Sequence, residues 1–246
     1  MVLRKEIAFE KSIPYHVLTR AIDGRKIFAE EDNCYRCIFR MYAANIGKPA
    51  PHLHRQDVIK AAKALLNGEA APEKFIIIEH SPLVYFLSFV VVPDHFHFEL
   101  VSDVENGISK LMQKLKGGFA KFFNKRTERR GNLFERPYKI IPIQTNFQAD
   151  AILRYINVIN VLDVYQPGWR KEGLRGKKTA FKFLNEYPFS SFSDLFGKRK
   201  SKIIAPREIL EKYLGKEITI SQEEFINFIK DFLHQRSLYN SSLFLE

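Results

Sequence analysis

The chain has little cysteine, little tryptophan and a shortage of acidic residues, and it lacks any long apolar run. No stretch approaches the roughly 20 apolar residues that a membrane-spanning helix requires. The first residues, MVLRKEIAFEKSIPYHV, contain no apolar core of the kind found in secretory signals. These absences exclude the membrane and signal-directed classes, and we expect a cytoplasmic protein.

The two cysteines, Cys34 and Cys37, form a single CxxC, and no second pair exists to complete a four-ligand zinc site. The surrounding stretch, EEDNCYRCIFRMYAA, has the spacing of an amphipathic helix. We therefore interpret both as ordinary buried thiols, in preference to half a metal site or a redox pair.

Basic residues are in excess: 39 Lys and Arg stand against 28 Asp and Glu, for a net charge of +11. A chain this basic usually meets a polyanion. The excess is concentrated in residues 107–130, where aromatic residues such as Phe119 and Phe122 interleave the charges. A solvated helix face would look similar, but the interleaving favours a nucleic-acid partner.

Hydrophobic periodicity and turn residues define an order of elements along the chain. We expect strands at 13–20, 74–80, 83–92, 95–101 and 136–143, and helices at about 31–44, 55–68, 107–128 and 146–162. Asn146 is the candidate cap of the last helix. The two strands that flank Pro93 and Asp94 form a plausible hairpin. This order predicts an α+β fold: an antiparallel sheet with helices packed mainly on one face.

The composition changes after Leu162, where polar, glycine-containing and basic stretches begin. We therefore divide the chain into a domain at 1–170 and an extension at 171–246 made of a basic linker and mostly helical segments. The sequence SQEEFINFIKDFLHQ predicts a helix in this extension, opened by a capping box from Ser221 to Glu224.

A pair of histidines, His95 and His97, lies within the apolar run FVVVPDHFHFELV. Because side chains alternate along a strand, both imidazoles point to one face and Phe96 and Phe98 to the other. Two imidazoles on a rigid strand are a ready pair of ligands for a divalent metal, although two solvent-facing histidines would give the same pattern. A second HxH, His52 and His54, lies in a proline-rich loop, and we interpret it as incidental.

Tyr155, in AILRYIN, shares a helix face with Ile152, Ile156 and Ile159. Spacing alone therefore indicates a core tyrosine.

Taken together, several stretches resemble the HUH single-tyrosine transposases, in particular their REP-associated, insertion-sequence-like branch. The stretch FVVVPDHFHFELV is similar to the family's His-hydrophobic-His strand. The stretch YHVLTRAIDGRKIFAEEDN is similar to the family's opening strand, and LMQKLKGGFAKFFNKRTERRGNLFERPYK is similar to its basic helix and the strand that follows. The segment AILRYIN resembles the helix that carries the family's nucleophile. The segment NEYPFSSFSDLFG resembles the closing segment of the family. The resemblance covers about residues 13–197 in the family's order.

The resemblance implies an HUH nuclease fold, of ferredoxin or RRM type, in the 1–170 domain. It also implies a nucleoid-associated transposase that acts on single-stranded DNA, with a hairpin as the expected form. His95 and His97 would hold Mg²⁺ or Mn²⁺, and Tyr155 would attack the scissile phosphate to form a 5′-phosphotyrosine. A phenol suits a reversible step because its unperturbed pKa of about 10 makes the phenolate both nucleophile and leaving group. We expect a monomer or homodimer and no membrane partner.

One position departs from the family pattern. The polar third metal ligand expected four residues after the tyrosine is replaced by Ile159. Asn160 would reach the site if a π-bulge turned the helix, and such bulges tend to occur at functional sites. Glu99, on the same strand face as the histidines, is the other candidate ligand. Both alternatives stay open at the level of sequence.

Basic side chains of the predicted basic helix and of the strand that follows it are candidate phosphate contacts. These are Lys110, Lys114, Lys121, Lys125, Arg126, Arg129, Arg130, Arg136 and Lys139.

Two rival functions are compatible with the same pattern. One is a non-catalytic nucleic-acid-binding protein with stacking aromatics on an open sheet face. The other is a replication-initiator or relaxase-like nuclease, disfavoured because no third histidine accompanies the pair.

Overall fold

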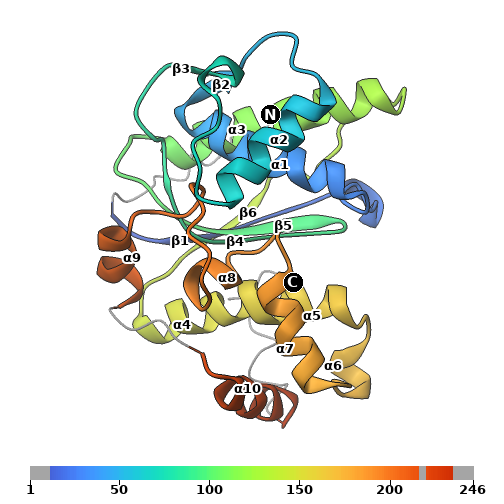
Figure 1. Cartoon of the computed structure of the whole chain (residues 1–246), viewed down its shortest axis with the longest axis vertical. Helices are drawn as coiled ribbons and strands as arrows, with labels where there is room; N and C mark the ends of the chain where they lie inside the picture. The colour runs from blue at the N-terminus through green and yellow to red at the C-terminus, as the bar shows by residue number, and fades with distance from the viewer. Residues whose placement is uncertain (1–11, 216–219, 235–246) are drawn as a thin grey trace, which may run out of the picture.

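The structure is a computed structural model that describes residues 12–215 and 220–234. Its centre is a four-stranded antiparallel sheet in the order β4-β5-β1-β6 (Figure 1). The strands are β1 (Tyr15–Arg20), β4 (Tyr85–Val92), β5 (His95–Val101) and β6 (Lys139–Pro142). The α+β class and the antiparallel sheet are confirmed.

The remaining elements surround this sheet. The longer helices are α1 (Glu31–Ile46), α2 (Arg55–Leu66), α3 (Gly107–Arg126), α4 (Asn146–Arg154), α5 (Asn160–Tyr165), α7 (Lys177–Glu186), α9 (Arg207–Leu214) and α10 (Gln222–His234). A π-helical turn, η3 (Tyr155–Ile159), joins α4 to α5. Short elements are η1 (Ile22–Gly24), η2 (Glu73–Phe75), α6 (Trp169–Glu172), α8 (Phe192–Leu195) and a separate two-stranded sheet of β2 (Gly47–Pro49) and β3 (Ile76–Ile78).

The β4–β5 hairpin carries the histidine pair, as the sequence predicted. Pro93 and Asp94 form the turn, and Val90 pairs with His97 while Val92 pairs with His95. Phe96 and Phe98 point into one core, as the alternation of a strand requires.

Helices cover both faces of the sheet (Figure 1). One face packs against α1, α2 and α3 around Phe96, Phe98 and Phe119. The other face packs against η3, α5 and α7 around Val90, Val92 and the buried Trp169. The expectation of helices mainly on one face therefore differs from the structure in this detail. The physical reason is that the second face is itself largely apolar and must also be buried.

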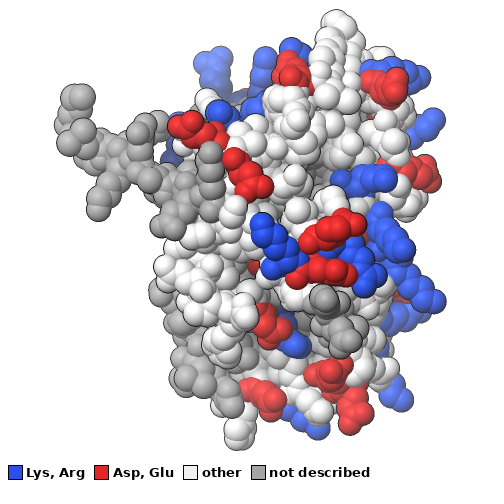
Figure 2. All heavy atoms as spheres, turned by 90° about the vertical axis from the view of Figure 1, so that its left-hand side faces the viewer, with Lys and Arg blue, Asp and Glu red and all other residues white. Residues whose placement is uncertain are grey.

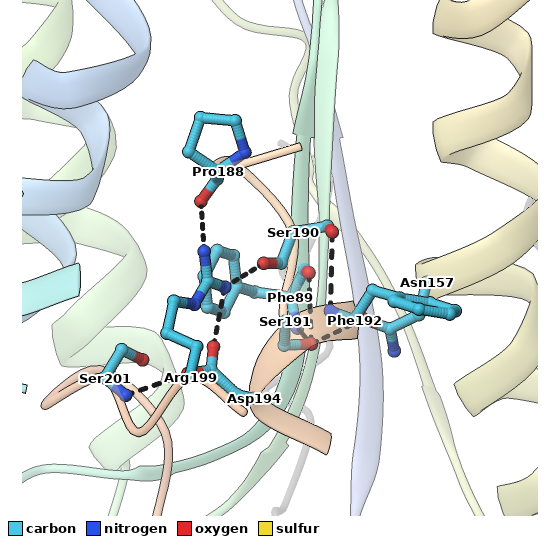
Figure 3. A network of polar contacts seen from close by, with 9 residues as sticks. All are labelled: Phe89, Asn157, Pro188, Ser190, Ser191, Phe192, Asp194, Arg199 and Ser201. Atoms are coloured by element: carbon cyan, nitrogen blue, oxygen red, sulfur yellow. Dashed lines mark hydrogen bonds and ion pairs between the residues drawn. The ribbon is translucent and has the colours of Figure 1, made fainter. Parts of the chain in front are cut away.

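Residues 187–205, which we call the edge segment, cover the outer edge of β4 (Figure 3). Val91 N–H donates to Phe189 O at 2.8 Å, and Ser191 N–H donates to Phe89 O at 2.9 Å. Further along, Ala205 N–H donates to Phe86 O at 2.9 Å. The edge segment thus forms hydrogen bonds with backbone N–H and C=O groups of β4 that an open edge strand would present to another chain.

The edge segment also reaches the helix that carries Tyr155. The Ser191 hydroxyl donates to Asn157 Oδ1 at 2.6 Å and accepts from Phe89 N–H at 2.9 Å, and all these groups are buried (Figure 3). Arg199 fastens the same segment by donating to Pro188 O at 2.9 Å and to Asp194 Oδ2 at 2.6 Å. One hydroxyl therefore links the sheet, the edge segment and the π-helical turn.

We expect Ser191→Ala to lower the free energy of unfolding by about 1–3 kcal/mol, because it leaves Asn157 Oδ1 and Phe89 N–H buried with one partner fewer. Urea denaturation measures this. Ser190→Ala is the matched control, since the Ser190 hydroxyl accepts only a long 3.4 Å bond from Phe192 N–H. Equal losses in both variants would contradict the assigned role of Ser191.

Several local predictions are confirmed and one needs correction. Cys34 and Cys37 are buried free thiols, and burial raises the pKa of Cys34 to about 12. The capping box joins Ser221 and Glu224 through two hydrogen bonds. The cap before α4 is Thr145, whose side chain accepts from Gln148 N–H, and not Asn146. Within the part of the chain that is described, no helix is long and apolar enough to span a membrane.

The boundary at residue 170 stays a prediction. Beyond it, Ala180 and Leu184 of α7 and Phe225 of α10 lie in the same buried cluster as Tyr155.

Candidate metal and nucleophile site

The histidine pair lies on the sheet face covered by η3. The rings of His95 and His97 are 5.0 Å apart between centroids, and the His97 ring is 5.5 Å from that of Tyr155. Strand β5 and the π-helical turn therefore bring together three of the residues singled out from sequence.

His95 is oriented by its neighbour in the hairpin turn. Its Nδ1 is 2.6 Å from Asp94 Oδ1, and this contact holds the pKa of the Asp94 carboxyl below its usual value. Its other ring nitrogen, Nε2, lies 3.4 Å from Asn160 Oδ1. A carboxylate on one nitrogen leaves the opposite nitrogen directed at the candidate third ligand, which is the usual arrangement behind a metal-binding histidine.

His97 is oriented by a histidine that the sequence reasoning missed. Its Nδ1 lies 2.8 Å from His16 Nε2, and the two rings stack at 5.0 Å. Its Nε2 is buried and has no hydrogen-bond partner. Burial, followed by the nearby His95 and His16, holds the pKa of His97 well below its ordinary value, so this imidazole is neutral, the form that binds metal.

Asn160 reaches His95 because the helix is π-helical just before it. The Asn160 backbone N–H donates to Tyr155 O, five residues earlier, and the side-chain amide donates to the same oxygen at 2.9 Å. The wider turn changes the angle between Tyr155 and Asn160, which an α-helix would place on different sides. The structure thus has the π-bulge that the Asn160 alternative requires.

Tyr155 is buried, with 2% of its surface exposed. Its ring packs edge-on against His97 and, at 6.4 Å, against His16. The Arg170 guanidinium of α6 lies 5.8 Å from the ring centroid, while also pairing with Asp163. Two histidines and a cation therefore lie close to the tyrosine ring.

Glu99 shares the strand face of the histidines but has different surroundings. It is fully buried, accepts from the Ser88 hydroxyl at 3.2 Å, and has one carboxyl oxygen without a partner. Burial raises the pKa of Glu99 to about 8. Asn160 Oδ1 lies 3.4 Å from His95 Nε2, whereas the hydrogen-bond partner of Glu99 is Ser88, so the geometry favours Asn160 over Glu99.

The raised pKa of Glu99 makes stability depend on pH. Between about pH 4.5 and 8 the folded state keeps a proton that the unfolded state has lost, so the free energy of unfolding falls as pH rises, by up to about 1.4 kcal/mol per pH unit. We expect Glu99→Gln to remove this slope and to be more stable than the wild type at pH 8. Urea denaturation at pH 5, 6.5 and 8 in a chelator checks this, and parallel pH profiles of the two proteins would contradict it.

The donor set fits a divalent cation. His95 Nε2 faces an amide oxygen, and His97 offers a buried nitrogen with no partner. Across residues 12–215 and 220–234, no group of three or more His, Cys, Asp and Glu side chains is placed to hold a metal. The Asn160 amide oxygen, 3.4 Å from His95 Nε2, is an oxygen donor beside the pair.

The sequence reasoning missed four residues around this site: His16, Asp94, Arg20 and Arg170. Asp94 was available as the direct neighbour of His95, and His16 as a histidine within the predicted first strand. Arg20 and Arg170 lie close enough to lower the pKa of His97 by their charges. No sequence signal connects Arg170 to the site, because its place depends on how α6 packs.

The predicted phosphate contacts of α3 lie elsewhere, whereas Lys139 of β6 pairs with Leu18, which also pairs with His97, and therefore lies on the sheet face of the histidine pair. Helix α3 packs against the sheet face opposite to Tyr155, so its basic side chains are in the other layer. Lys110, Lys121, Lys125, Arg126, Arg130, Arg136 and Lys139 are exposed, and Lys114 and Arg129 are half-buried. Their role in binding stays a prediction.

Some of these cations have structural partners. Arg126 pairs with Glu30 and donates to Asn33 Oδ1 at 2.9 Å, and Arg129 donates to Asn132 O at 2.7 Å. Lys114 lies 3.7 Å from a carboxyl oxygen of Glu79. Figure 2 shows that, on the side of the molecule where α9 lies, Lys and Arg alternate with Asp and Glu instead of forming one continuous basic patch.

The second HxH pair is not part of the site. His52 is exposed with a positive φ of 61°, and His54 caps α2 through its backbone N–H, which donates to Asp57 at 3.1 Å.

Residues 54–158 match a family model described as "Transposase IS200 like". A solved structure described as a REP-associated tyrosine transposase bound to a REP hairpin is similar over 79% of this chain and 85% of its own, with 12% identity and a TM-score of 0.44. Comparison with curated protein sequences finds no match.

Proposed function

Because residues 54–158 belong to the IS200-like transposase family, we propose that this chain cleaves and rejoins single-stranded DNA through a covalent bond to Tyr155. The expected substrate is a strand that contains a hairpin, and the expected cofactor is Mg²⁺ or Mn²⁺.

One observation carries the proposal. His95 and His97 from β5, and Tyr155 and Asn160 from the two ends of the π-helical turn, meet on one sheet face, with Tyr155 against His97 and Asn160 against His95. A core tyrosine would need no such partners. A nucleophile beside a ligand set for a divalent cation is what phosphoryl transfer to a tyrosine requires.

In the reaction, the Tyr155 phenolic oxygen forms a bond to the scissile phosphorus while the bond from phosphorus to the 3′ oxygen breaks. The phenol gives up its proton and the departing 3′ oxygen gains one, so the products are a 5′-phosphotyrosine and a free 3′-hydroxyl. Because the phosphotyrosine conserves a phosphodiester bond, attack by another 3′-hydroxyl reverses the step and joins strands.

The residues around Tyr155 supply the electrostatics. A divalent cation held by His95, His97 and Asn160 would neutralise charge on the phosphoryl oxygens. Asp94 and His16 hold the two imidazoles in place. Arg170, above the tyrosine ring, is placed to attract the phosphate.

The described conformation is closed, since Tyr155 and His97 are 2% and 0% exposed. The cover includes Trp169 and Arg170, which α6 carries. DNA therefore has to displace part of this cover before the phosphate reaches Tyr155, so an opening step precedes the chemistry.

The non-catalytic alternative is less well supported. It requires an open sheet face with stacking aromatics, whereas helices cover both faces. Among the described residues, the exposed large hydrophobic side chains are Ile77, Ile78, Val104 and Phe147, and none lies in the four-stranded sheet.

The proposal is tested with a pool of single-stranded hairpins with randomised flanks, incubated with the protein and Mg²⁺ or Mn²⁺. We expect a protein–DNA adduct that survives denaturation and maps by mass spectrometry to the peptide containing Tyr155. Retention of DNA without any adduct from the pool would favour the binding protein over the transposase.

Asn160→Ala is expected to weaken Mn²⁺ binding about 10-fold or more, because it removes the amide oxygen opposite His95 Nε2. Isothermal titration of the DNA-free protein measures this. Glu99→Gln is the matched control and should bind Mn²⁺ like the wild type. The reverse pattern would identify Glu99 as the third ligand.

A further inference from the structure

We propose that His16 is a positioning residue of this site: it accepts a hydrogen bond from His97 Nδ1–H and thereby leaves His97 Nε2 as the atom that binds the cation. The inference rests on the proposed function, because it concerns the metal ligand that this function requires.

The sheet register places the two rings together. His16 pairs with Glu99 across β1 and β5, and Leu18 pairs with His97, so His16 and His97 are diagonal neighbours on one face. Both side chains are fully buried, and the 2.8 Å contact joins His16 Nε2 to His97 Nδ1. This spacing is that of a normal hydrogen bond, so one of the two nitrogens carries the proton.

The position of that proton decides whether His97 can bind a metal. If His97 Nδ1 carries it, Nε2 has a free lone pair, which agrees with the absence of any hydrogen-bond partner at that buried atom. If His16 Nε2 carries it, neutral His97 holds its own proton on Nε2 and cannot act as a ligand there. A buried N–H at Nε2 without an acceptor would also be costly, which favours the first arrangement.

The neighbouring histidine, His95, likewise has a partner on its Nδ1 ring nitrogen. His95 has its Nδ1 against Asp94 and its Nε2 toward Asn160. Each histidine of the pair therefore has an outer partner on Nδ1, a carboxylate for His95 and an imidazole for His97. Such partners fix the ring orientation and tautomer of metal-binding histidines, and their loss typically costs about 10–100-fold in metal affinity.

The experiment measures Mn²⁺ affinity by isothermal titration of the DNA-free full chain. His16→Phe keeps a ring of similar shape but removes the acceptor, and we expect Mn²⁺ affinity to fall about 10–100-fold. His16→Gln retains an oxygen that can accept from His97 Nδ1–H, so we expect affinity within about threefold of the wild type. His97→Ala serves as the ligand knockout and His80→Phe as the control at a distant histidine.

A second readout does not depend on variants. Two-bond ¹H–¹⁵N NMR of the histidine rings reports which nitrogen carries the proton. In the wild type with Mg²⁺ we expect His97 to be protonated on Nδ1. A proton on His97 Nε2 under these conditions overturns the inference, even if His16→Phe fails to fold.

The outcomes separate this inference from the proposed function. If His97→Ala binds Mn²⁺ as tightly as the wild type, the assignment of the metal site to the histidine pair is refuted. If His97→Ala loses binding but His16→Phe retains it, the site stands and the role of His16 is refuted. Loss in His16→Phe with rescue in His16→Gln supports both.

Discussion

Replacing Tyr155 by phenylalanine is expected to abolish the covalent protein–DNA adduct. The substitution removes the phenolic oxygen, which is the atom that would attack the phosphorus, and phenylalanine offers no nucleophile in its place. The ring itself stays, so its edge-on packing against His97 and its burial in the apolar cluster around Val90 and Trp169 are preserved. Denaturing gel electrophoresis of the protein after incubation with labelled hairpin DNA measures the adduct.

The matched control for this variant is Tyr165→Phe. Tyr165 lies at the end of α5, one short helix beyond η3, and its ring packs on Phe183 at 5.3 Å. We expect its adduct yield to equal that of the wild type. An adduct in Tyr155→Phe, or its loss only in Tyr165→Phe, would move the nucleophile away from the histidine pair.

His97→Ala has the second largest expected effect. It removes a buried ligand nitrogen and also leaves His16 Nε2 without its 2.8 Å partner. Because the cation would carry much of the charge stabilisation, we expect adduct formation to fall by about 100-fold or more at a fixed Mn²⁺ concentration. Time courses of adduct formation over a range of Mn²⁺ concentrations check this.

The chain contains its own control for that experiment in the loop histidines. His52→Ala changes an exposed histidine of the other HxH pair, and it should leave the adduct rate unchanged. Sensitivity of the adduct to His52→Ala with insensitivity to His97→Ala would show that the wrong HxH was chosen.

The sequence determined the parts of this protein that depend on neighbours along the chain. The alternation of a strand put His95 and His97 on one face, and the Pro93–Asp94 turn closed the hairpin that presents them. The capping box at Ser221 is equally local. These features follow from backbone periodicity and side-chain-to-backbone hydrogen bonds within a few residues, so a single sequence contains the information for them.

Only the tertiary structure decided what meets the histidines. The register of β1 against β5 brings His16 to His97, although 81 positions separate them. The π-helical turn brings Asn160 to His95, which the sequence could offer only as one of two alternatives. Packing also put the basic helix α3 on the opposite face of the sheet, and it laid the edge segment along β4. The physical reason is that strand register, helix packing and edge covering are set by burial between distant segments, and periodicity within one segment carries no record of its partner.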